Sequence, residues 1–164
     1  MNNKIIILCD TLEKDNKQIK QWFKENKIMA FSTRLATGDY IAIKYNDKIG
    51  FYVEREIVID LKNKILEICQ NLCGSTANHE KEKRKLERAK YFGFKRFVFL
   101  IYDKKITCIE DLNEWSSDRT KIKGSTLAKV LTTMQEKYNC EFMFVNDKKM
   151  VGKEIFELLN NKQT

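Results

Sequence analysis

Runs of hydrophobic residues predict the first strands of this chain. Two runs, at residues 5–9 and 97–102, show no polar alternation and are rich in β-branched and aromatic side chains. Such runs are typical of central strands that are covered on both faces. Two half-polar stretches at residues 40–45 and 49–56 flank a polar Asn-Asp-Lys turn, which predicts an antiparallel hairpin.

The remaining apolar residues mostly recur at spacings of three and four, which predicts amphipathic helices. We expect helices at residues 14–26, 61–72, 77–92, 124–138 and 149–160, and a further strand at 142–145. Strands that alternate with helices, together with one internal hairpin, indicate the α/β class. The prediction is therefore a single domain over residues 1–164, with a mixed sheet flanked by helices.

The composition fits a globular domain and excludes several other classes of protein. Of 164 residues, 43% are hydrophobic and 11% aromatic, which is enough apolar material for a core. No apolar run approaches the roughly 20 residues that span a bilayer, and the first run is too short for a signal peptide. Five scattered cysteines favour reduced thiols. We expect a cytoplasmic protein that is neither secreted nor inserted in a membrane.

The charge balance points to a polyanionic partner. The chain carries 31 Lys and Arg against 23 Asp and Glu, a net charge of +8, which favours nucleic acid. The excess is concentrated at residues 79–96, which include most of the predicted helix at 77–92, and in the loop before Gly124. The residues predicted to contact DNA are Lys81, Arg84, Lys85, Arg88, Lys121 and Lys123. A merely solvated basic face is the alternative for the same residues.

Acidic residues of the predicted hairpin form the sharpest candidate site. Strand alternation puts Glu54 and Glu56 on one face, and Asp39 lies where the partner strand begins. Converging carboxylates raise one another's pKa unless a cation lies between them, so such a group is typical of a hard-metal site. We therefore expect Asp39, Glu54 and Glu56 to converge.

The order of these motifs resembles a known family. Gly38-Asp39 is followed by Glu54-Arg55 at the end of a strand and then by Asp60-Leu61, and the chain opens with Asp10 and Glu13 after its first strand. This order resembles the nuclease domain of the XPF-type structure-specific endonucleases, a branch of the PD-(D/E)xK superfamily. The resemblance implies a restriction-endonuclease-like mixed sheet flanked by helices. The chain is similar in size to small phage or bacterial proteins that resemble Holliday-junction resolvases.

The resemblance also implies a function. It implies a metal-dependent, structure-selective DNA endonuclease that hydrolyses phosphodiester bonds in branched DNA (junction, flap or fork) during DNA repair and recombination. Asp39 and Glu54 would hold Mg²⁺ (or Mn²⁺), and Glu56 would orient or deprotonate the attacking water. The accessory positions would be Asp10, Glu13, Arg55 and Asp60. The implied partners are branched DNA and a second copy of the chain, in the cytoplasm of a bacterial or phage-infected cell.

Departures from the family pattern leave alternatives open. The family has lysine after Glu-Arg, whereas this chain has Glu56, so a catalytically inactive DNA-binding protein on the same fold is the second hypothesis. A nearby lysine (Lys44, Lys62 or Lys64) is another source of the missing cation. A protein-interaction domain without a nucleic-acid role is a third hypothesis. Locally, Asp10 with Glu13 also fits a capping box, and Asp60 also fits a helix N-cap.

Overall fold

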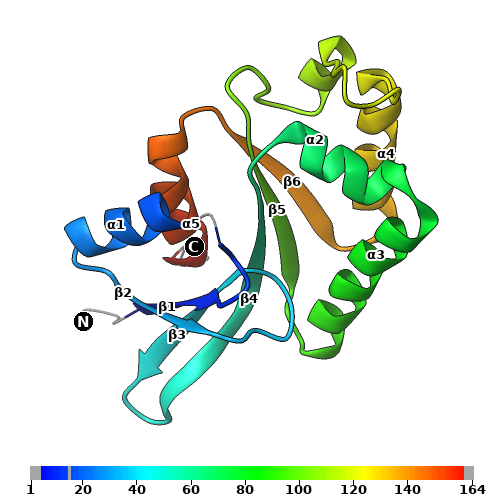
Figure 1. The fold of residues 1–164 in the computed structure, drawn as a ribbon. Coiled ribbons are helices and arrows are strands. Elements are labelled where there is room, and N and C mark those ends of the chain that lie inside the picture. The colour runs from blue at the N-terminus through cyan, green and yellow to red at the C-terminus, as the bar shows by residue number, and fades with distance from the viewer. Residues whose placement is uncertain (1–4, 15, 161–164) are drawn as a thin grey trace.

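In the residues that the computed structural model describes, 5–14 and 16–160, six strands form one mixed sheet with helices on both faces (Figure 1). The strands are β1 (Ile5–Asp10), β2 (Met29–Thr33), β3 (Tyr40–Asn46), β4 (Gly50–Lys62), β5 (Arg96–Tyr102) and β6 (Cys140–Val145). The helices are α1 (Lys17–Glu25), α2 (Ile65–Cys69), α3 (Thr76–Tyr91), α4 (Gly124–Lys137) and α5 (Val151–Asn160). The predicted α/β class and mixed sheet are confirmed.

The sheet has an antiparallel centre and parallel flanks. Its strand order is β2-β1-β3-β4-β5-β6. β3 is antiparallel to both β1 and β4, whereas β2 is parallel to β1, and β5 and β6 continue parallel to β4. Because neighbouring antiparallel strands run in opposite directions, β3 begins beside the end of β4, with Tyr40 opposite Ile59. This register decides which side chains meet at the candidate site.

Two hydrophobic cores lie on opposite faces of the sheet. α1 and α5 cover one face, and α2, α3 and α4 cover the other (Figure 1). Alternation along β4 sends Ile57, Ile59 and Leu61 into the core beneath α1 and α5, while Val58 enters the opposite core. Asp60 and Lys62 share the parity of Val58, so they face the layer that contains α3.

The main correction to the predicted elements concerns β4. The sequence predicted a strand that ends at residue 56 and a helix from residue 61, but β4 continues to Lys62 and α2 begins at Ile65. Residues 57–62 stay extended because they pair in parallel with β5 over residues 96–101. Asp60 is therefore a strand residue, and its predicted role as a helix N-cap is wrong.

Two further differences lie near the N-terminus. β2 was not predicted, because it is an edge strand whose side chains are largely exposed and show no hydrophobic pattern. α1 begins at Lys17 with Asn16 in the capping position, so Asp10 and Glu13 do not form a capping box there. The other predicted strands and helices are confirmed with shifts of a few residues at their ends. Among the described residues, no helix is long and apolar enough to cross a membrane.

Gly38 and Gly50 provide a matched pair for testing how tightly the entry to β3 is packed. Both have positive φ, 67° and 77°, but a Cβ at Gly38 would overlap Val58 and lie 3.0 Å from the Ile59 carbonyl oxygen, whereas a Cβ at Gly50 would meet nothing within 4 Å. We expect Gly50→Ala to lower the free energy of unfolding by about 1 kcal/mol and Gly38→Ala by roughly 2–4 kcal/mol. Urea unfolding of both variants measures this, and equal losses would contradict the packing argument.

Candidate active site

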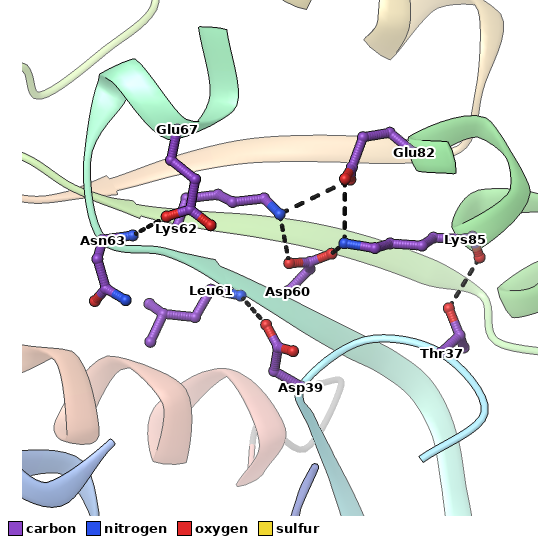
Figure 2. Close-up of polar contacts among 9 residues, drawn as sticks. All are labelled: Thr37, Asp39, Asp60, Leu61, Lys62, Asn63, Glu67, Glu82 and Lys85. Atoms are coloured by element: carbon purple, nitrogen blue, oxygen red, sulfur yellow. Dashed lines mark hydrogen bonds and ion pairs between the residues drawn. The ribbon is translucent and has the colours of Figure 1, made fainter. Parts of the chain in front are cut away.

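Main-chain hydrogen bonds hold Asp39 where β1, β3 and β4 meet. The Asp39 N–H donates to the Ile59 carbonyl at 2.8 Å, and the Asp39 carbonyl accepts from the Asp10 N–H at 2.8 Å. One side-chain oxygen, Oδ2, accepts from the Leu61 N–H at 2.7 Å. The carboxyl group of Asp39 is therefore directed along β4 toward residues 60–62 (Figure 2).

Asp60 is the centre of a buried ring of ion pairs between β4 and α3 (Figure 2). Its Oδ1 lies 3.0 Å from the Lys62 ammonium and its Oδ2 lies 2.8 Å from the Lys85 ammonium. Glu82 completes the ring, with one oxygen 3.2 Å from Lys85 Nζ and the other 3.8 Å from Lys62 Nζ. Asp60, Lys62 and Glu82 are at most 3% exposed. Two acids and two lysines therefore alternate around one buried ring.

The ring determines the charge of Asp60. Burial by itself raises the pKa of this carboxyl group, but the ammonium groups of Lys62 and Lys85 outweigh burial, so the pKa of Asp60 is lowered. Burial also opposes the charge of Lys85, yet Asp60 and Glu82 raise the pKa of Lys85. Asp60 is therefore an anion and Lys85 a cation at neutral pH.

The pKa of Asp39 is shifted in the opposite direction. Burial and the negative charge of Asp60 raise its pKa to about 8, with a smaller contribution from Glu13, while the Leu61 N–H and Lys62 act to lower the pKa. Two carboxyl groups with pKa values driven apart in one site are typical of catalytic and metal-binding centres. A bound cation would stabilise the ionised form of Asp39 in the same way that Lys62 and Lys85 stabilise Asp60.

The predicted convergence of Asp39, Glu54 and Glu56 is not found. Glu54 pairs with Lys44 at 3.1 Å, opposite Ala42 in the hairpin, and Glu56 pairs with Lys95 just before β5. These glutamates precede Asp60 by six and four residues, and the register of β4 against β3 shifts between Tyr40 and Ala42. Among the described residues, Asp39, Glu54 and Glu56 are not gathered into one group that could hold a metal ion.

Three of the four predicted accessory residues lie near Asp39, and the fourth does not. Asp10 is 7% exposed, lies at the end of β1 and accepts a hydrogen bond from the Leu35 N–H at 3.1 Å, while Glu13 is close enough to raise the pKa of Asp39. Asp60 is at the centre of the site. Arg55 is exposed, and its guanidinium lies beside Gly93 at the end of α3 rather than near Asp39.

The predicted DNA-contacting residues lie on the same side of the sheet as Asp60. Lys81, Arg84 and Arg88 are exposed on α3, whereas Lys85 is partly buried against Asp60. Lys121 and Lys123 are exposed in the loop that leads into α4, which packs on the same core as α3.

Lys62 and Glu82 lie beside Asp60, although the family motif in the sequence includes neither of them. From the sequence alone, Lys62 is only one of three lysines that could replace the missing cation. The signal was nevertheless present: Asp60-Leu61-Lys62 has the acid-x-lysine spacing and directly follows a buried apolar strand run. Glu82 had no comparable signal, because it lies within a helix crowded with charges and only the packing of α3 on β4 makes it buried.

The donor set fits a magnesium-type cation that is shared with a substrate. Among the described residues, no group of three or more His, Cys, Asp or Glu side chains is arranged to hold a metal ion alone. Mg²⁺ commonly uses one or two protein carboxylates and takes its remaining ligands from water and phosphate. Asp39 and Asp60 meet that requirement, and the raised pKa of Asp39 indicates a carboxyl group that a cation would stabilise.

Comparison with known proteins finds a matching family and solved structures with a similar fold. The ERCC4 domain family matches residues 9–158. The fold is similar to two solved structures of XPF from Aeropyrum pernix: one with 11% identity and a TM-score of 0.63 over 96% of this chain, and one in complex with DNA with 14% identity and a TM-score of 0.63 over 94%. The chain spans 62% and 63% of those two chains. No curated protein sequence matches it.

The raised pKa of Asp39 predicts how stability depends on pH. The ordinary pKa of this carboxyl group is 3.8 and the folded value is about 8, so between these values the folded state binds more protons than the unfolded state. The stability that Asp39 contributes is therefore fully present below about pH 4 and is lost as pH rises through 8. Asp39→Asn keeps the acceptor for the Leu61 N–H but cannot ionise.

Urea unfolding at several pH values in EDTA tests this expectation. Relative to Asp39→Asn, the unmodified protein should lose roughly 2–4 kcal/mol of unfolding free energy between pH 5 and pH 8. Other titrating groups cancel in the difference between the two proteins. Parallel stability curves would show that Asp39 titrates normally and would contradict the prediction.

Proposed function

The chain belongs to the ERCC4 domain family, a family of nuclease domains, and from that premise we propose that it is a divalent-metal-dependent DNA endonuclease that cuts branched DNA. The single observation that carries the proposal is the arrangement of Asp39, Asp60 and Lys62. These residues have the acid, then acid-x-lysine pattern of the superfamily that the sequence resembles. The proposed centre thus lies six residues beyond the Glu54-x-Glu56 pair that the motif comparison favoured.

Asp39 and Asp60 would hold the metal ion. When bound, Mg²⁺ or Mn²⁺ polarises a scissile phosphate and lowers the pKa of a coordinated water. Lys62 contributes a positive charge beside Asp60, held by Asp60 at 3.0 Å and by Glu82 at 3.8 Å, so its ammonium is oriented before substrate binds. An ammonium in that position can donate hydrogen bonds to a phosphate oxygen or to the attacking water.

Glu82 and Lys85 position the groups around Asp60. Glu82 keeps both ammonium groups beside Asp60 because it lies within ion-pair distance of Lys85 and of Lys62. The Lys85 carbonyl accepts a hydrogen bond from Thr37 Oγ1 at 2.9 Å, which links α3 to the segment before Asp39. The two acids are thereby held in register by elements that are far apart in sequence.

The charge distribution supports DNA as the substrate. Three exposed cations of α3, at positions 81, 84 and 88, lie on the helix whose inner side contacts Asp60. One of the similar solved structures is a complex with DNA. Branched DNA, the Mg²⁺ requirement and the homodimer remain predictions, and the last of these is measured by sedimentation of the purified chain.

Under this proposal, the non-catalytic alternative no longer has the observation that motivated it. That hypothesis arose because Glu56 occupies the lysine position after Glu54-Arg55. If the acid-x-lysine element is Asp60-Leu61-Lys62, the lysine is present and Glu56 is a partner of Lys95 outside the centre.

Cleavage assays with matched variants test the proposed centre. We expect purified protein to cut a labelled flap or four-way junction in Mg²⁺ or Mn²⁺ and not in EDTA. Asp39→Asn, Asp60→Asn and Lys62→Gln should each lower the cleavage rate by at least about 100-fold, because each removes a proposed metal ligand or the charge that orients the reacting groups.

Glu54→Gln and Glu56→Gln are the controls, since they remove acids of the same strand that lie outside the proposed centre. Both should keep activity within about threefold. Loss of cleavage in Glu54→Gln together with full activity in Asp60→Asn would support Glu54 as the metal ligand, as the family resemblance implied, and would overturn the assignment of Asp60. Circular dichroism of every variant separates loss of chemistry from loss of fold.

The basic helix predicts a salt dependence of DNA binding. Replacing Lys81, Arg84 and Arg88 by Gln should lower the slope of log affinity against log salt by about 2–3, since each phosphate contact contributes about 0.7–0.9. The control replaces three exposed lysines on helices of the opposite face, Lys17, Lys24 and Lys153. Equal changes in the two triple variants, measured by fluorescence anisotropy in EDTA, would show that only net charge matters.

A further inference from the structure

The exposed side of α3 carries a stripe of three cations that ends in an aromatic ring. Lys81, Arg84, Arg88 and Tyr91 are spaced by three, four and three residues, and all four side chains are exposed. Residues at these spacings share one face of a helix. The opposite face packs on the sheet through Glu82, Leu86 and Ala89. The stripe therefore runs along the outer side of the helix whose inner side contacts Asp60.

Tyr91 is a strongly exposed aromatic side chain at the end of α3. It is 84% exposed, and its ring meets the ring of Phe92, itself 40% exposed, edge to face at 5.4 Å. The end of α3 is closed by main-chain hydrogen bonds from Phe92 to Arg88, from Gly93 to Lys90 and from Phe94 to Ala89. A preformed ring pair loses little conformational entropy when a flat ligand stacks on it.

Cations surround this aromatic pair. Arg88 and Lys90 lie within the last turn of α3, and the Arg55 guanidinium lies beside Gly93. A second exposed pair, Tyr45 with Phe51 at 5.1 Å, lies at the hairpin tip beside Asp47 and Lys48, whose charges cancel. A second copy of the chain would bring like charges together at Tyr91, which is unfavourable. Rings beside cations instead fit a ligand that carries both flat bases and phosphates.

The distance from the proposed centre sets where that ligand would bind. Lys85, which contacts Asp60, precedes Tyr91 by six residues, or roughly 9 Å along the helix at 1.5 Å per residue. That length corresponds to at most about three nucleotides, at the 3.4 Å rise per nucleotide of a stacked strand. Arg88 lies midway, where a backbone phosphate between the two positions would pass.

We propose that Tyr91, supported by Phe92, stacks on an unpaired base of DNA within about three nucleotides of the phosphate at the Asp39–Asp60 centre. The proposal rests on the proposed nuclease function and names the feature of branched DNA that this domain recognises. A base inside a duplex is already stacked on both faces, so only an unpaired base gains a new partner. Tyr91 thus favours substrates with a single-stranded segment next to the cleavage position.

Binding measurements in EDTA test the stacking role without requiring cleavage. The probe is a flapped DNA with 2-aminopurine in its single-stranded arm, compared with a fully paired duplex of the same sequence. Tyr91→Ala should weaken binding of the flapped DNA by about 10-fold, remove the quenching of 2-aminopurine and leave duplex affinity within twofold. Tyr91→Phe keeps the ring and should behave like the unmodified protein.

Tyr45→Ala is the matched control, because it removes an equally paired exposed aromatic from the neutral hairpin, and it should change neither measurement. Equal weakening of flap and duplex by Tyr91→Ala, or no weakening at all, would overturn the stacking proposal. So would a change in the sedimentation mass of the DNA-free variant, which would indicate a protein contact. If the protein binds the flap through Tyr91 but never cuts, the nuclease function fails and the stacking proposal stands.

Discussion

The burial of Asp60 is the constraint on which the rest of this molecule depends. Its carboxyl group is 1% exposed on the central strand of the sheet, yet it remains charged because Lys62 and Lys85 lie within 3.0 Å of its two oxygens. Burying such a charge without partners is strongly unfavourable. α3 must therefore pack against β4 in a register that delivers both Lys85 and Glu82. The position of α3, and with it the position of the exposed basic stripe, follows from this electrostatic requirement.

The topology of β4 brings two acids together that are 21 residues apart in sequence. β4 has one half in an antiparallel hairpin with β3 and another half parallel to β5. Because antiparallel neighbours start and end at opposite ends, the residue that enters β3 lies beside the residues that end β4. Asp39 and Asp60 consequently meet at one point, with pKa values shifted in opposite directions. The same register places Glu54 opposite Ala42, where its side chain pairs with Lys44.

One helix serves two electrostatic tasks. The inner side of α3 compensates the acid on the sheet, and its outer side presents cations to solvent along the direction in which the helix leaves the site. A polyanion attracted by the outer cations is thereby guided past the buried acids. The charged residues of the inner side and those of the outer side alternate every few residues along α3. The local composition therefore shows only that this helix is highly charged.

The sequence by itself determined the order of the strands and helices apart from β2, the mixed α/β sheet and the family, because these depend on local hydrophobic periodicity and on the order of short motifs. It also contained the acid-x-lysine element at residues 60–62, but local patterns allow a strand that ends at residue 56 as readily as one that ends at 62. Only pairing with β5, more than thirty residues away, keeps residues 57–62 extended. Tertiary structure therefore decided which acids meet, because charge compensation across β4 and α3 is a non-local interaction that no local pattern contains.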